Sequence, residues 1–122
     1  MFKDIKEQLH ELFKGGHPDY IDDTLEELDL YSRKNTDYTK GGDPFGNFKR
    51  ISAILKIWGF DVPPVLVALI YSLKQQDALM WMLSQKYEGQ IEGKQERFRD
   101  IGVYTKIAKI LDRLMSQELK NK

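Results

Sequence analysis

Charged side chains on two predicted helices are the residues of this sequence best suited to chemistry. Lys74 and Asp77 are three positions apart in the most apolar stretch, and Glu96 and Asp100 are four apart further on. At these spacings two side chains leave the same face of a helix. Neighbouring carboxylates repel each other unless a cation lies between them, and Mg²⁺ prefers such hard oxygen ligands. The spacing therefore indicates a Mg²⁺ site formed by the three acids, beside which Lys74 could neutralise the charge of a phosphate.

Each pair also has a plainer interpretation, and the sequence leaves both open. Glu96 and Asp100 could be a solvated acid pair that makes ordinary surface contacts with Arg97 and Arg99. The lysine and aspartate of the earlier pair could face solvent or bind each other. Exposed ion pairs of this kind contribute little to stability.

The segment from Lys34 to Phe48 is a second candidate site. It is expected to be a loop over 35–44 between two helices, and Gly41 and Gly42 would let its backbone approach a ligand closely. It lacks the glycine and lysine spacing of a Walker-type phosphate loop. Plain turn chemistry, with Asp43 capping the next helix, is compatible with binding. The side chains in it that suit recognition of a base or sugar are Lys34, Asn35, Asp37, Tyr38, Asp43 and Asn47.

The elements that must position these residues are all helical. Apolar residues recur at spacings of three and four, and no segment shows the alternation of a strand. The fold class predicted is therefore all-α, a bundle of four main helices plus a short N-terminal helix, in one domain over 1–122. The expected helices cover 2–13, 21–34, from Pro44 to Gly59, 62–86 (the longest) and 95–118.

The fourth of these helices should bury a defined apolar stripe. The stripe consists of Leu66, Leu69, Ile70, Leu73, Leu79 or Met80, and Leu83. A short polar turn over 88–94 joins this helix to the last one, so the two should pack antiparallel. Residues 77 and 100 would then lie level across their interface, and the three acids would converge on one polar pocket. Removing one charge from such an acid cluster, as in Asp100→Asn, should stabilise the metal-free protein.

Composition restricts the class of function. Nineteen basic and 19 acidic residues give no net charge, whereas a dedicated duplex-DNA binder usually has a basic excess, so nucleic acid is disfavoured as a partner. No apolar run reaches the roughly 20 residues that span a bilayer, so no membrane partner is expected. The absence of cysteine excludes thiolate chemistry and agrees with a cytoplasmic location. Large apolar residues are abundant for so short a chain, including Trp58 and Trp81, which predicts a homo-oligomer.

Two motifs in this chain resemble a known family. Lys34-Asn35-x-Asp37-Tyr38, followed by Gly42-Asp43-Pro44-x-x-Asn47-Phe48, is similar to a signature of small phage and bacterial nucleotide-modification-associated domains. These look like relatives of the all-α nucleoside triphosphate pyrophosphohydrolases of MazG type. The similarity continues through Val67-Ala68-Leu69-Ile70 and Lys74. It ends with the pattern Glu96-x-x-x-Asp100-Ile101-x-x-Tyr104, and it covers about residues 24–112.

The resemblance implies a function and a set of roles. Enzymes of this type hold Mg²⁺ on paired acids of two helices and convert a (deoxy)nucleoside triphosphate to the monophosphate and pyrophosphate, often as dimers that share the site. Here Lys74 stands where the first pair has a carboxylate, and Glu96 to Asp100 is one residue wider than the second pair. Either fewer metals are held or hydrolysis has been lost. The alternatives are therefore a non-catalytic nucleotide-binding module and a phage protein that binds a host factor through a helical face.

Overall fold

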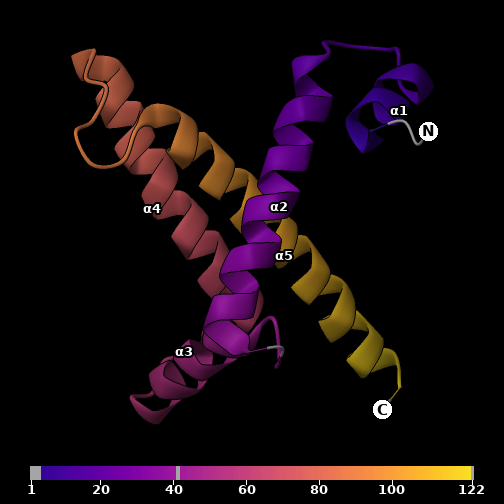
Figure 1. Ribbon diagram of the computed structural model, residues 1–122. Helices are drawn as coiled ribbons and strands as arrows, with labels where there is room; N and C mark the ends of the chain where they lie inside the picture. The colour runs from indigo at the N-terminus through magenta and orange to yellow at the C-terminus, as the bar shows by residue number, and fades with distance from the viewer. Residues whose placement is uncertain (1–3, 41, 122) are drawn as a thin grey trace. The chain divides into compact units, whose positions relative to one another are not determined.

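The structure, a computed structural model, describes residues 4–40 and 42–121, except for the side chain of Tyr38. Within this part of the chain it is all-helical, which confirms the predicted fold class (Figure 1). The helices are α1 (Ile5–Leu12), α2 (Asp19–Thr39), α3 (Gly46–Ile57), α4 (Pro64–Gln85) and α5 (Lys94–Lys120). They fall into two compact units, residues 1–41 and 42–122.

The first unit is a helical hairpin of α1 and α2. Asp22 on α2 accepts a hydrogen bond from His10 Nε2 of α1 at 2.8 Å and lies 3.6 Å from Lys6 Nζ. The hydrogen bond from the histidine, aided by the nearby Lys6, holds the pKa of the Asp22 carboxyl below its ordinary value. Polar contacts rather than a buried core connect the two helices, since no described residue of α1 is buried.

The end of α2 corrects the predicted loop. The helix continues through Thr39, so Asn35 and Asp37 lie on a helix and not in a loop that begins at 35. The hydroxyls of Thr36 and Thr39 are accommodated within the helix, because each donates a hydrogen bond to the backbone carbonyl four residues earlier. The helix ends only at Lys40, whose backbone is left-handed with φ 50°.

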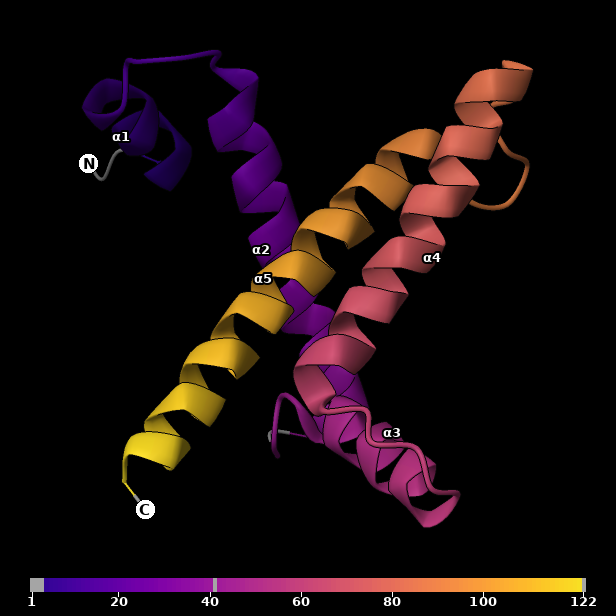
Figure 2. The ribbon, with the colours of Figure 1, turned by 180° about the vertical axis from the view of Figure 1, so that it is seen from behind.

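The second unit is built on an antiparallel hairpin of α4 and α5, with α3 packed on α4 (Figure 2). Small residues lie at the α4–α5 contact: Ala68 and Ser72 are fully buried and Ala108 almost so, which lets the two helices approach closely. Larger side chains complete the core, namely Phe45, Phe48, Val67, Leu79, Met82, Ile107 and Leu111. Rings of Phe48, Tyr71 and Tyr104, with centroids 5.4 to 6.3 Å apart, connect α3, α4 and α5.

The predicted buried stripe of α4 was mostly wrong. Of its members only Leu79 is buried. Leu73 and Met80 are 60% and 61% exposed, and the other four members are 41% to 51% exposed. The helix is apolar on nearly all sides, so its pattern does not single out one face. The small residues Ala68 and Ser72 decide which side meets α5. Trp58 and Trp81 are exposed too, at 76% and 57%, and α5 rather than α4 is the longest helix.

Asp43 fixes the entry to α3. Its Oδ1 accepts a hydrogen bond from the backbone N–H of Phe45 at 2.9 Å, and its Oδ2 lies 2.7 Å from Lys49 Nζ. The lysine first, and then the backbone donor, hold the pKa of the Asp43 carboxyl below its ordinary value. The helix begins at Gly46, two residues after Pro44.

Candidate functional site

A polar network crosses the interface between α4 and α5. Arg97 Nη1 donates to Gln75 Oε1 at 2.7 Å, and Gln75 Nε2 donates to Asp100 Oδ2 at 3.4 Å. Arg97 Nη2 also lies 3.7 Å from Glu92 Oε2 in the turn before α5. One amide thus connects a guanidinium and a carboxylate that are three residues apart on the facing helix.

The network is half-buried, which distinguishes it from a surface ion pair. The Arg97 side chain is only 21% exposed, and its Nε is buried without a hydrogen-bond partner among the residues that the structure describes. Placing charged and amide groups in a helix interface costs free energy unless hydrogen bonds replace water. A half-buried guanidinium beside a carboxylate can bind a phosphate through the former and a cation through the latter.

Asp77 and Lys74 do not belong to this network. Asp77 follows Gln75 by two residues, which is roughly 200° around an α-helix, so it lies on nearly the opposite side of α4. Both Lys74 and Asp77 are exposed. Over residues 4–40 and 42–121, no three acidic or histidine side chains form a group that could hold a metal ion. A single copy of the chain therefore does not gather Asp77, Glu96 and Asp100 into one three-carboxylate site.

Glu96 lies one turn before Asp100, near the start of α5. It is exposed, whereas Asp100 is half-buried. The helix begins after Gly93 without a side-chain cap, and Lys94 in its first turn pairs with Glu88 at 2.8 Å. The predicted acid pair thus shares one edge of α5, with one member at the interface and one in solvent.

The expected base-recognition residues are divided between the two units. Lys34, Asn35 and Asp37 lie on α2 in the first unit, where the Asn35 carbonyl oxygen accepts from Thr39. Asp43 and Asn47 lie before and in the first turn of α3 in the second unit. The prediction for the Tyr38 side chain falls outside the described residues.

Sequence reasoning missed Gln75 and Arg97 as site residues. Arg97 was placed among ordinary surface pairs and Gln75 was passed over between two charges. A signal was present, because residue 75 lies on the same side of its helix as the small residues Ala68 and Ser72. A glutamine on the packed side of an apolar helix needs polar partners, and the next helix supplies them.

Comparisons with known proteins add no relative: no family model, curated protein or solved structure matches the chain. Among the helices described, none combines the length and the apolar character that crossing a membrane requires. The functional argument therefore depends on the geometry of the α4–α5 network and on the residue patterns of the sequence.

Proposed function

We propose that this protein is a Mg²⁺-dependent, nucleoside triphosphate pyrophosphohydrolase-like protein that converts a (deoxy)nucleoside triphosphate to the monophosphate and pyrophosphate in the cytoplasm. The observation that carries the proposal is the half-buried trio Gln75, Arg97 and Asp100. Together with Glu96 it supplies, on one edge of a helix hairpin, the two kinds of group that a metal-bound polyphosphate needs. The order and spacing of the sequence motifs support the same class of reaction.

Arg97 would bind the phosphates. Its planar guanidinium can donate two parallel hydrogen bonds to phosphate oxygens, and its low exposure strengthens that attraction. Gln75 holds the guanidinium in place through the 2.7 Å hydrogen bond. The arginine is thus oriented before the substrate binds.

Asp100 and Glu96 would hold the metal. Two carboxylates on adjacent turns fit Mg²⁺ that takes its remaining ligands from water and substrate phosphates, a common arrangement for this ion. They do not fit a site of three protein carboxylates, because Asp77 lies on the other side of α4. Bound Mg²⁺ would polarise the phosphoryl group and favour attack by water. The assignment of base or sugar contacts to Lys34, Asn35, Asp37, Tyr38, Asp43 and Asn47 stays a prediction from the sequence.

Release of pyrophosphate from a panel of deoxynucleoside and ribonucleoside triphosphates tests the proposal. We expect Mg²⁺-dependent release by the unaltered chain, and its loss in Asp100→Asn and in Arg97→Gln. Asp112→Asn is the matched control, since Asp112 is an exposed acid further along α5. No release with any triphosphate, or full release by Asp100→Asn, would overturn the proposal.

A non-catalytic nucleotide-binding module is the second candidate. The observation that favours it is that the described residues of one copy contain no group of three potential metal-ligating side chains. Lys74 in place of a carboxylate favours it as well. Calorimetric binding of a magnesium nucleotide without pyrophosphate release would select this candidate, and Arg97→Gln should then abolish the binding.

A further inference from the structure

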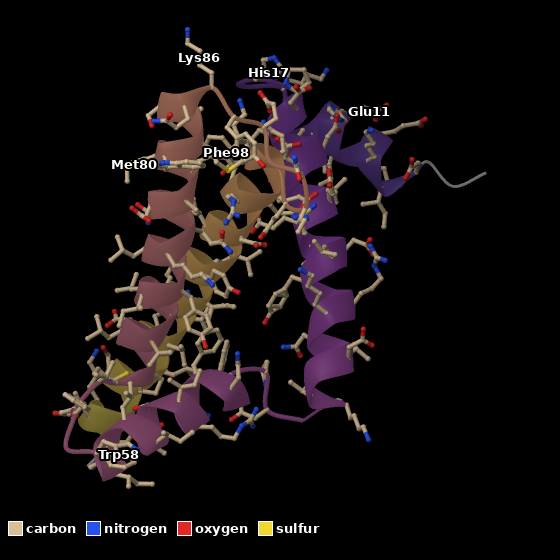
Figure 3. All side chains as sticks on the ribbon, turned by 90° about the vertical axis from the view of Figure 1, so that its left-hand side faces the viewer. Glu11, His17, Trp58, Met80, Lys86 and Phe98 are labelled. Atoms are coloured by element: carbon tan, nitrogen blue, oxygen red, sulfur yellow. The ribbon has the colours of Figure 1, made fainter. Side chains whose placement is uncertain are left out.

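The side of α4 that faces away from α5 carries six exposed apolar side chains, with two charged residues between the fourth and the fifth. These side chains expose between 41% and 61% of their area, and they span residues 66 to 81, a little more than four turns of the helix. Met80, labelled in Figure 3, is one of them. We call this surface the outer α4 face; it consists of Leu66, Leu69, Ile70, Leu73, Met80 and Trp81.

The area of the outer α4 face is close to what a dimer needs. With about 200 Å² for a fully exposed large apolar residue, its six members expose roughly 600 Å² together. The largest apolar patch on a typical monomer is about 300–600 Å², and each partner of a standard interface buries about 800 Å². One helix face therefore supplies most of the apolar area of a stable contact.

The charges on α4 indicate which partner fits. Lys74 and Asp77 are the only charged residues between Pro64 and Gln85. They lie at the middle of the outer α4 face, and neither side chain has a hydrogen bond or ion pair with any other described residue. An apolar surface with one positive and one negative charge at its centre is complementary to itself under two-fold rotation.

We propose that a second copy of this chain docks on the outer α4 face, with the two α4 helices antiparallel. The two-fold axis would cross the contact at the point along α4 that is midway between residues 75 and 76. Residues 74 and 77 are equally distant from that point, about 2 Å along the helix on either side. Lys74 of each copy then lies beside Asp77 of the partner subunit, and Ile70 is level with Trp81 of the partner subunit. Two equivalent ion pairs would then form at the centre of an otherwise apolar contact.

This inference does not depend on the proposed function. It assigns Lys74 and Asp77 to assembly, whereas Gln75, Arg97 and Asp100 lie on the other side of α4 from the contact. A chain that dimerises without releasing pyrophosphate would support the inference and not the function. A monomeric chain that releases pyrophosphate would do the reverse.

Light scattering on the full chain tests the contact. We expect twice the chain mass of 14.3 kDa at micromolar concentration, and a return to 14.3 kDa for Leu73→Asp. Ile91→Asp is the matched control, because Ile91 is 98% exposed in the turn before α5 and should leave the dimer intact. Unchanged helical circular dichroism shows that each variant is folded. A monomeric parent chain, or a dimer that survives Leu73→Asp, would overturn the proposal.

Charge exchange tests the register. Lys74→Glu alone places two acids together at both ends of the central contact, and Asp77→Lys alone places two lysines together there. Each should weaken the dimer at least tenfold. The double variant with both changes restores opposite pairs and should recover the affinity of the parent to within threefold. A double variant no tighter than the single ones would refute the register. A monomeric parent chain whose melting temperature falls in Leu73→Asp would overturn the dimer itself and would indicate that another part of the same chain, such as residues 1–41, covers the face.

Discussion

Gln75 forms hydrogen bonds with both Arg97 and Asp100 across the α4–α5 interface, and replacing it by leucine removes both bonds. The variant loses a charge-assisted hydrogen bond of 2.7 Å and a long one of 3.4 Å. A bond to a charged group contributes about 1.5–3 kcal/mol, and the long bond adds little because it is near the limit of useful geometry. Arg97 keeps its contact with Glu92 and a fifth of its surface in water, which reduces the loss. We therefore expect Gln75→Leu to lower the free energy of unfolding by about 1–2 kcal/mol.

Urea denaturation followed by circular dichroism measures this loss. Gln76→Leu is the matched control, since Gln76 is the next residue and donates only a neutral hydrogen bond to Ser72 of its own helix. It should cost about 1 kcal/mol or less. A double-mutant cycle of Gln75→Leu with Arg97→Met should give a coupling energy of about 1 kcal/mol. A coupling energy near zero, with Gln75→Leu as stable as the parent, would show that the network does not hold the helices together.

Three further changes test separate parts of the fold. Gly89→Ala should cost on the order of 1–3 kcal/mol in the same denaturation assay, because residue 89 has φ 87° and a Cβ there would collide with the Glu92 carbonyl oxygen. Leu79→Ala should cost about 2–5 kcal/mol by thermal or chemical unfolding, because Leu79 is the buried leucine of α4. The pKa of Asp22 is lowered in the fold by His10, so its stabilising contribution is complete above the ordinary value of 3.8 and is lost as pH falls through the lowered value. Asp22→Asn should flatten the acid limb of a plot of melting temperature against pH, and an unchanged limb would contradict this assignment.

The fold could be predicted because the apolar periodicity and the glycine, proline and polar residues that end helices indicate the same set of helices along this sequence. The hairpin of α4 and α5 followed from the short turn over 88–94. The packed side of α4 could not be predicted, because apolar residues surround that helix and their pattern has no single direction. The contact face is chosen by Ala68 and Ser72, whose small size lets another helix approach. A search for large apolar residues therefore selects the wrong side.

The candidate site was predicted only in part for the same reason. Asp100 was assigned to a functional interface from its spacing with Glu96, and the structure places it in a half-buried network. Asp77 was joined to it on the assumption that both flank one core. In the structure the opposite side of α4 is packed against α5, so Asp77 lies on the outer α4 face. Gln75, not Asp77, faces Asp100.

The sign of one stability change separates the two descriptions of Asp100. If Asp100 belonged to a cluster of repelling acids, Asp100→Asn would stabilise the metal-free protein. In the network, Asp100 instead accepts a hydrogen bond from Gln75 and shares that amide with the Arg97 guanidinium. The neutral variant weakens the compensation of a half-buried positive charge, so it should destabilise the fold by roughly 0.5–1.5 kcal/mol. Unfolding in a metal-free buffer with a chelator measures the difference, with Asp112→Asn as the control for loss of an exposed acid on α5. A more stable Asp100→Asn would contradict the network and return Asp100 to an acid cluster, which one copy of the chain does not form among its described residues.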